Sequence, residues 1–174
     1  MKNQQDYKIK QSEKGKNFLN LFRKDCEMDK LLGFEFEVIK PGTITYHFTV
    51  EERHLSSPGI CHGGIISALM DASLGMAALS RAAEEDKVCS TVEFKTNFIA
   101  PARLGDKIIA HAELDFQGKN LMVSSCSIYK DSDKETKETV AKGIGTFNLY
   151  PMDKRVSVNS SGIYEYKKNS TESD

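Results

Sequence analysis

The 174-residue sequence lacks tryptophan and lacks an excess of charge of either sign. It has 24 Lys and Arg residues against 25 Asp and Glu residues, for a formal net charge of -1. Binding to nucleic acid draws on a surplus of basic side chains that neutralise phosphates. We therefore expect no nucleic-acid partner.

Closely spaced cysteines are also missing. The four cysteines are far apart and form no C-x-x-C pair, and no group of Cys and His residues has the spacing of metal ligands. The first residues of the chain are polar, without the apolar segment that a signal peptide needs. We expect reduced thiols, a cytoplasmic location and no metal. The cysteines are Cys26, Cys61, Cys89 and Cys126.

No hydrophobic run is long and apolar enough for lipid. The longest apolar segment, residues 63–80, contains Asp71 together with glycines and serines. An acidic group in the middle of a membrane helix is strongly disfavoured. The sequence therefore predicts no membrane insertion.

A chain of this length is typical of one domain with a sizeable core. Its two ends, residues 1–16 and residues 151–174, are polar. We expect a flexible N-terminal extension and a flexible C-terminal tail there. The folded domain is predicted to span residues 17–150.

Hydrophobic periodicity predicts an α+β fold. Apolar residues recur with a helical period over residues 17–32, which predicts a short amphipathic helix ended by Gly33. A second helix of about five turns, from residue 63 onward, is apolar on nearly every side and belongs inside the domain. Alternating patterns predict six strands, mostly joined as antiparallel hairpins around this helix. The strand-like segments are residues 34–38, 44–50, 92–98, 108–116, 121–129 and 139–149.

The segment before the central helix carries the sequence H-G-G at residues 62–64. The first amides of a helix have no acceptor within the helix, so those of Gly63 and Gly64 can bind an oxygen and stabilise negative charge there. The plainer interpretation is a tight connection between strand and helix, because glycine is common in turns.

Asp71 is the one charged side chain between His62 and Arg81. A lone carboxylate on an apolar helix is costly unless it is paired or hydrogen-bonded. Three explanations fit: a buried hydrogen bond to Ser or Thr, a window that faces solvent, or a catalytic role. The residues on its helical face are small, so a ligand or another chain can come close. These neighbours are Ser67, Ala68, Gly75 and Ala78.

Taken together, these motifs resemble those of the hot-dog-fold acyl-CoA thioesterases, in particular the phenylacetate-pathway (PaaI-like) subgroup. The resemblance rests on H-G-G at residues 62–64, Asp71 at helical spacing, Thr91-Val92-Glu93-Phe94 and the sequence P-A-R-L-G-D at residues 101–106. It runs from about residue 33 to residue 149. It implies an antiparallel sheet around a long helix, hydrolysis of an acyl-CoA and no separate cofactor, since coenzyme A is part of the substrate.

The resemblance also implies roles for particular residues. The Gly63 amide polarises the thioester carbonyl, and Asp71 of the partner subunit acts as general base or nucleophile. His62 orients the thioester, and Thr91 helps to hold the water. Similar enzymes carry Asn where this sequence has Ser56, and a hydroxyl has fewer hydrogen-bonding groups than an amide.

Further expectations concern the substrate and the assembly. Gly64, Arg103, Gly118 and Lys119 are candidates for binding the substrate, with the basic residues meeting the phosphates of coenzyme A; Lys107 and Lys142 are weaker candidates. These cations equally fit a solvated rim of the sheet. The resemblance implies a homodimer with shared active sites, and often a tetramer. Candidates for lining the acyl pocket are Met70, Leu74, Met76 and Phe98.

Two other functions stay open. A non-catalytic module that binds acyl-CoA or lipid as a sensor would keep the cavity but not turnover, and Ser56 in place of Asn motivates this alternative. A dehydratase of the same fold ranks last, because its sequence context is not seen here. The adjacent Cys61 and His62 form a weak candidate for a nucleophile and its base, because such partners usually meet in space and not in sequence.

Overall fold

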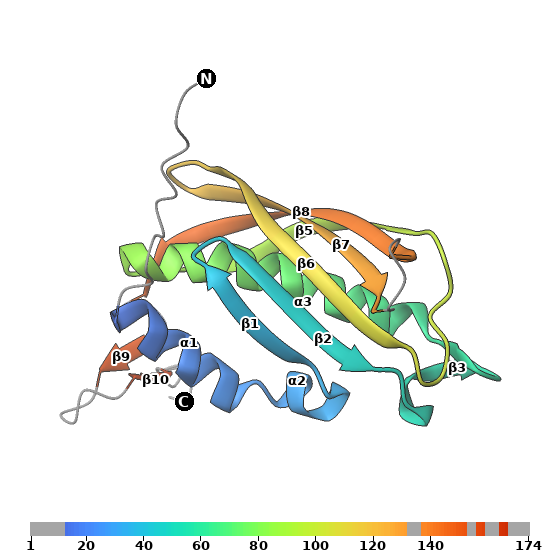
Figure 1. Cartoon of the computed structure of the whole chain (residues 1–174). Coiled ribbons are helices and arrows are strands. Elements are labelled where there is room, and N and C mark those ends of the chain that lie inside the picture. The colour runs from blue at the N-terminus through green and yellow to red at the C-terminus, as the bar shows by residue number, and fades with distance from the viewer. Residues whose placement is uncertain (1–12, 132–136, 153–155, 159–163, 167–174) are drawn as a thin grey trace, which may run out of the picture.

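A six-stranded antiparallel sheet wraps around one long helix in this computed structural model, which describes residues 13–131, 137–152, 156–158 and 164–166 (Figure 1). The strand order is β1-β2-β6-β7-β8-β5. This architecture confirms the predicted α+β fold with a central helix. The strands are β1 (Glu35–Lys40), β2 (Thr43–Thr49), β5 (Lys87–Phe98), β6 (Lys107–Gln117), β7 (Leu121–Lys130) and β8 (Thr139–Pro151).

The central helix is α3 (Gly63–Ala82), which continues into the short 3-10 helix η2 (Ala83–Glu85). Leu69, Met70 and Leu74 on α3 have no exposed surface. By length and composition alone, the segment Gly63–Glu85 could cross a membrane. The strands that pack on α3 already cover it, and a buried core helix passes the same test.

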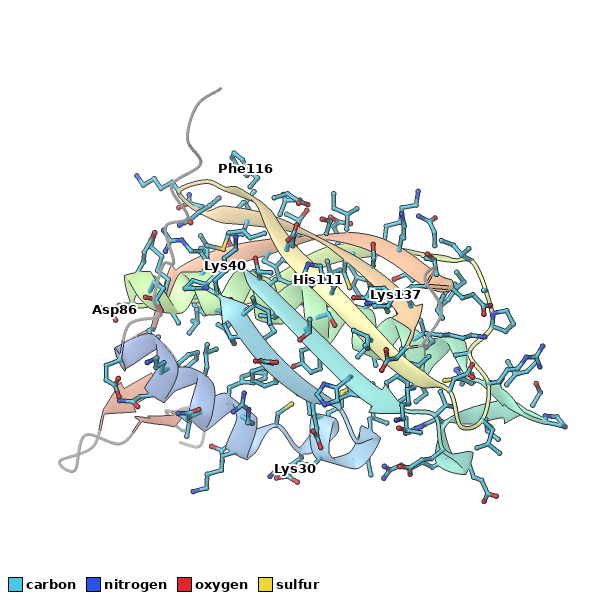
Figure 2. The ribbon with its side chains drawn as sticks, viewed as in Figure 1. Lys30, Lys40, Asp86, His111, Phe116 and Lys137 are labelled. Atoms are coloured by element: carbon cyan, nitrogen blue, oxygen red, sulfur yellow. The ribbon has the colours of Figure 1, made fainter. Side chains whose placement is uncertain are left out.

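The sheet has one apolar face and one polar face, as its period of two predicts. On β6, Ala110 and Ala112 are fully buried toward α3. Between them, His111 lies on the outer face, where its Nε2 is 3.2 Å from Glu113 Oε1 (Figure 2). The core therefore lies between the sheet and α3.

The predicted helix over residues 17–32 is in fact two helices, α1 (Glu13–Asp25) and α2 (Glu27–Leu32). Cys26 between them has a non-helical backbone (φ -77°, ψ 89°), and Gly33 ends α2 in the left-handed conformation, as expected for a C-cap. The break rotates the apolar face. Met28 and Leu31 are 54% and 67% exposed, and the buried residue of α2 is Asp29.

Strand β5 also differs from its prediction. Alternation placed Val92 and Phe98 on a buried face, but they are 59% and 57% exposed. The pairing of β5 with β8 shifts register between Thr91 and Glu93, so Val92 bulges out of the ladder. Among the described residues β5 pairs with β8 alone, which leaves a strand with exposed apolar side chains at the edge of the sheet.

Two small sheets were not predicted. Before α3, the 3-10 helix η1 (Glu52–His54) leads into β3 (Leu55–Ser57), which pairs with β4 (Ile60–Cys61). Near the C-terminus, β9 (Val156–Val158) pairs with β10 (Tyr164–Tyr166), and this hairpin lies beside α1 (Figure 1). Both strands fall in the segment that was expected to be a flexible tail. Residues 1–12 of the expected N-terminal extension lie outside the described residues, and residues 13–16 belong to α1.

Candidate active site

The start of α3 presents one backbone donor. His62 is the N-cap residue, and its Nδ1 accepts a hydrogen bond of 2.7 Å from the Gly64 amide. The Gly64 amide is thus occupied, which counts against its predicted role in binding substrate. The Gly63 amide has no acceptor within the part of the chain that the structure describes. Because Nδ1 accepts this hydrogen bond, the neutral form of the exposed His62 ring carries its proton on Nε2.

Backbone hydrogen bonds fix the loop that carries Gly63. The His62 amide donates to His54 O (2.7 Å), the Cys61 amide to Ala102 O (2.9 Å) and the Leu104 amide to Gly59 O (3.0 Å). The turn containing P-A-R-L-G-D therefore lies against the loop containing H-G-G. Two of the motifs singled out in the sequence therefore belong to one unit joined by backbone hydrogen bonds.

An apolar hollow of about 320 Å³ lies next to Gly63. Its lining includes Phe98, Ile99 and Pro101. A Cβ atom added to Gly63 would lie 3.6 Å from the Phe98 ring, which is ordinary van der Waals contact. Phe98 thus borders the candidate oxyanion donor and not the pocket at Asp71.

Asp71 and Thr91 form the second part of the site. The Thr91 hydroxyl on β5 donates a hydrogen bond of 2.9 Å to Asp71 Oδ1 on α3. Asp71 is half-buried and Thr91 is exposed. This contact joins two residues to which the family resemblance assigns the same chemistry.

Both residues open on a pocket of about 240 Å³. The small side of α3 forms one wall through Ala68, Ala72 and Gly75. Of the predicted stripe of small residues, Ala68 and Gly75 line the pocket, whereas Ser67 and Ala78 do not. Met76 also lines the pocket, as expected. Met70 and Leu74 do not, because both are fully buried in the core between α3 and the sheet.

Within one chain, the two parts of the site are far apart. Gly63 and Asp71 are eight residues apart on α3. At 1.5 Å per residue, this separation is about 12 Å. A base and an oxyanion donor that serve the same carbonyl must each come within about 3 Å of the reacting atoms. These two residues of one chain cannot do so together.

The predicted binding residues Arg103, Gly118 and Lys119 are divided between the two ends of α3. Arg103 is exposed beside the loop of Gly63, at the N-terminal end of the helix. Gly118 and Lys119 form the turn between β6 and β7, where the Gly118 amide donates to Leu121 O (2.8 Å). This turn follows Gln117, which bonds to Glu85 at the other end of α3. One chain does not bring these residues together.

Ser56, the residue in place of the family asparagine, is exposed on β3. It lies where the pairing of β3 with β4 shifts register. Its hydroxyl has no hydrogen-bond partner among the residues that are described. Its strand pairs with β4, which leads directly into His62 and Gly63, so Ser56 lies on the side of the Gly63 half of the site.

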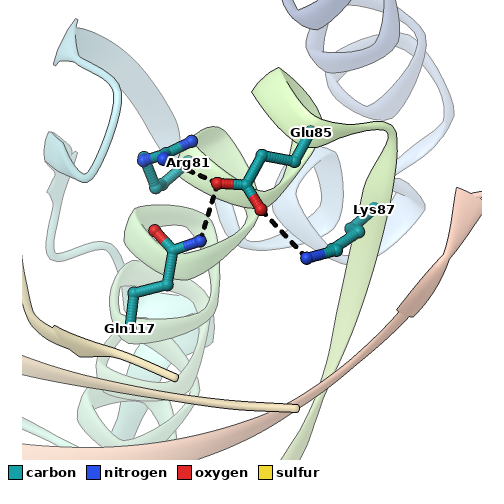
Figure 3. Close-up of polar contacts among 4 residues, drawn as sticks. All are labelled: Arg81, Glu85, Lys87 and Gln117. Atoms are coloured by element: carbon teal, nitrogen blue, oxygen red, sulfur yellow. Dashed lines mark hydrogen bonds and ion pairs between the residues drawn. The ribbon is translucent and has the colours of Figure 1, made fainter. Parts of the chain in front are cut away.

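Glu85 anchors the C-terminal end of the α3 segment (Figure 3). Arg81 (2.7 Å) and Gln117 (2.9 Å) reach its Oε1, while Lys87 (2.9 Å) reaches its Oε2. Hydrogen bonds from Lys87 and then from Gln117 lower the pKa of Glu85 to about 2. The carboxylate thereby ties η2 to β5 and β6.

Glu85→Gln is expected to destabilise the protein in a pH-dependent way. The ordinary pKa of this group is 4.5 and the folded value is about 2, so its stabilising effect is complete above pH 4.5 and is lost as the pH falls toward 2. At neutral pH we expect a loss of about 1 kcal/mol, typical of a partly exposed ionic network. Thermal unfolding of both proteins at pH 7 and near pH 2 checks this. The same difference at both pH values would contradict it.

Some features of the site were not predicted. The Cys61 thiol is buried, and burial raises its pKa to about 11, which argues against Cys61 and His62 as a nucleophile and its base.

Asp29 and Tyr46 line the same pocket as Asp71. A sequence signal for Asp29 existed: it lies three residues after Cys26 and seven after Phe22, on the apolar side of the predicted helix.

Comparison with known proteins gives consistent results. The sequence model of the thioesterase superfamily matches residues 58–137 of this chain. Human acyl-coenzyme A thioesterase 13 is 31% identical over 109 residues, which are 63% of this chain and 74% of that protein.

Solved structures show the same fold. The E. coli PaaI protein from the phenylacetic acid degradation operon has a TM-score of 0.69 at 22% identity, covering 81% of this chain and 96% of that one. A hypothetical thioesterase protein from Streptococcus pneumoniae, solved with coenzyme A, has a TM-score of 0.59 at 21% identity, covering 68% of this chain and 89% of that one.

Proposed function

Because this chain belongs to the thioesterase superfamily and is a thioester hydrolase, we propose that it hydrolyses acyl-CoA at a site shared between two copies of the chain. Asp71 and Thr91 come from one subunit and the Gly63 amide from the other. The observation that carries the proposal is the hydrogen bond from Thr91 to Asp71 at the mouth of an apolar pocket.

The chemistry requires one base and one oxyanion donor. Water attacks the thioester carbonyl carbon while Asp71 takes a proton from it, and the oxygen that becomes negative accepts a hydrogen bond from the Gly63 amide. The C–S bond then breaks, the proton held by Asp71 passes to the sulfur so that coenzyme A leaves as its thiol, and the acid is released. The dipole of α3 adds to the stabilisation, because Gly63 lies at its positive end.

Asp71 could instead attack the carbonyl itself and form an anhydride. The position of Thr91 favours the role of Asp71 as a general base. The Thr91 hydroxyl donates its proton to Asp71 Oδ1, so the lone pairs on the hydroxyl oxygen can hold a water beside the carboxylate. Single turnover in ¹⁸O-labelled water separates the two routes. Attack by water places the label in the released acid, whereas hydrolysis of an anhydride at the Asp71 carbonyl places it in the protein.

The edge strand β5 supports assembly through this side of the sheet. Among the described residues it has unpaired backbone groups along its outer edge and the exposed side chains of Val92 and Phe98. A second copy of the chain would cover the backbone groups and these side chains. Thr91 lies on β5 and Phe98 lies next to Gly63, so an interface here would include both halves of the site. Sedimentation at micromolar concentration should show a dimer or a tetramer. A monomer would contradict the shared site.

Assembly of two copies of the chain would also bring together the residues that are candidates for binding coenzyme A. Arg103 lies beside Gly63, whereas Gly118 and Lys119 lie at the opposite end of α3 in the same chain. Phosphates need cations, and Arg103 is exposed with no carboxylate paired to its side chain among the described residues. The proton on His62 Nε2 would orient the thioester by a hydrogen bond. Ser56 lies on β3, on the same side of the domain as His62.

Thr91→Val is expected to lower kcat by about tenfold while leaving the fold intact, because valine has nearly the same shape but cannot hold the water or bond to Asp71. Thr91→Ser keeps the hydroxyl and should retain most of the rate. Steady-state hydrolysis by the three proteins checks this. Equal rates for Thr91→Val and the wild type would remove Thr91 from the mechanism.

Acyl-CoA hydrolysis by the wild-type protein tests the proposed function itself. Short, medium, long and aryl acyl groups should be compared by mass spectrometry, which needs no thiol reagent and so avoids the four cysteines. Turnover of at least one acyl class is the expected result. Binding without turnover would instead support the sensor, whose motivation is Ser56 in place of asparagine.

A further inference from the structure

A buried histidine lies beside the loop that carries Gly63. His54, the last residue of η1, is 1% exposed, and it lines neither the pocket at Asp71 nor the hollow beside Gly63. Its ring packs edge-on against the Phe48 ring of β2, with the ring centroids 5.3 Å apart. Burial of a polar ring is costly unless its nitrogens are bonded, so an apolar side chain would fill this place at lower cost. The presence of histidine here therefore needs an explanation.

One nitrogen of the ring fixes the backbone of η1. Nδ1 of His54 accepts a hydrogen bond of 3.0 Å from the Glu51 amide. The Glu51 side chain accepts a hydrogen bond from the His54 amide in return, which completes a capping box. Burial lowers the pKa of His54, and the charge of Arg53 lowers it further. The ring is therefore neutral near neutral pH, so Nδ1 stays an acceptor.

The carbonyl group of the same residue holds the loop that leads to Gly63. His54 O accepts the hydrogen bond of 2.7 Å from the His62 amide. The extended backbone of His62 (φ -63°, ψ 134°) sets the direction in which the next amide, that of Gly63, points. The Cys61 amide is held separately by Ala102 O. The hydrogen bond to His54 O is thus the last one that fixes an amide of this loop before Gly63.

Contacts in series therefore connect the core to the candidate oxyanion donor. We propose that His54 is a positioning residue, whose buried ring fixes the carbonyl group that holds the Gly63 N–H in its direction toward the thioester oxygen. This inference rests on the proposed function, because it takes the Gly63 amide to be the oxyanion donor. Such a donor is effective only when it is aimed at the place where charge develops, at about 3 Å. A displacement of about 1 Å can cost roughly 100-fold in rate.

A purely structural role is the competing explanation for the buried ring. A structural role predicts that activity falls with thermal stability. A positioning role affects the transition state, so kcat and kcat/KM should fall together while KM stays the same. It also acts only through the Gly63 N–H, so its effect should vanish in a protein that lacks this N–H.

Two variants of His54 separate its ring from its acceptor. His54→Phe keeps a ring against Phe48 but removes the acceptor of the Glu51 amide, and it should lower kcat by about tenfold with KM unchanged. His54→Asn loses the ring but keeps a short side chain with an acceptor oxygen. Its kcat should be close to that of the wild type, although the cavity beside Phe48 lowers its melting temperature. Activity should thus follow the acceptor and not the stability.

His47→Phe is the matched control. His47 precedes Phe48 on β2 but is exposed on the outer face of the sheet, where its Nε2 is 3.2 Å from Glu35 Oε2. The same change of histidine to phenylalanine at this position should leave kcat at the wild-type value. A similar loss in His47→Phe and His54→Phe would show an effect of the substitution on the sheet and not on the Gly63 N–H.

The most direct measurement repeats His54→Phe in the Gly63→Pro background. Gly63→Pro removes the N–H through which His54 acts, so the second substitution should leave the residual kcat unchanged. A structural effect would lower kcat about as much in this background as in the wild type. Phe48→Leu loosens the His54 ring from its other side and should give the same pattern with a smaller loss. The test therefore does not depend on the folding of any one variant.

Each remaining outcome has a definite meaning. Losses that add in the Gly63→Pro background would overturn the inference while leaving the thioesterase intact. A wild-type kcat in folded His54→Phe protein would do the same, and so would equal losses in His54→Phe and His54→Asn. If the wild type hydrolyses no acyl-CoA, the proposed function itself fails, and the positioning role fails with it.

Discussion

Asp71→Asn is expected to lower kcat/KM for acyl-CoA hydrolysis by roughly 10²–10⁴-fold, the usual contribution of a positioned base. Asparagine has nearly the same shape, and its amide oxygen can still accept the hydrogen bond that Thr91 donates to Oδ1. It cannot take a proton from water or attack the carbonyl. Hydrolysis followed by mass spectrometry, with thermal unfolding as the measure of folding, checks the prediction.

Asp115→Asn is a matched control for this variant. Asp115 also accepts a hydrogen bond of 2.9 Å from a hydroxyl group, that of Ser125, but it lies exposed on β6 and does not line the pocket at Asp71. It should retain the wild-type rate. If Asp71→Asn were as active as Asp115→Asn, the carboxylate of Asp71 would have no part in the reaction.

Gly63→Pro should cost roughly 10²–10³-fold in kcat, because it removes the N–H that we assign to the oxyanion. The local structure accommodates proline well. Gly63 is the first residue of α3, where proline is favoured, and His62 before it is extended (φ -63°, ψ 134°), as a residue preceding proline prefers to be. The variant therefore removes one donor with little change to the helix.

Gly63→Ala is the control for Gly63→Pro. An added Cβ meets only the Phe98 ring at ordinary contact distance, and the N–H is kept. Most of the wild-type rate should remain. If alanine and proline lower kcat equally, the effect comes from crowding beside Phe98 and not from the missing donor.

Much of the fold follows from periodicity, because a period of two with one apolar face is enough to specify a half-buried strand. The polar outer face of β6 at His111 and the fully buried Leu69 on α3 agree with that reasoning. Gly33 was identified as the end of its helix because the left-handed conformation favours glycine.

Periodicity does not reveal what covers an apolar face. Val92 and Phe98 alternate like buried residues but are exposed in the single chain, as expected for a face that a second copy covers. The break at Cys26 was missed because the apolar period continues through it. The burial of Asp29 depends on Tyr46, which is 17 residues away in sequence, and no local pattern reports such a pairing.

Mixing two inactive variants tests the shared site most directly. Asp71→Asn lacks the base and Gly63→Pro lacks the oxyanion donor, so each alone should be nearly inactive. If the site joins Asp71 of one subunit to Gly63 of the other, a mixed dimer contains one site with both groups intact. After subunit exchange in equal amounts, half of the dimers are mixed, and activity should recover to about a quarter of the wild-type value. No recovery, in a mixture shown by mass spectrometry to contain mixed dimers, would contradict the account.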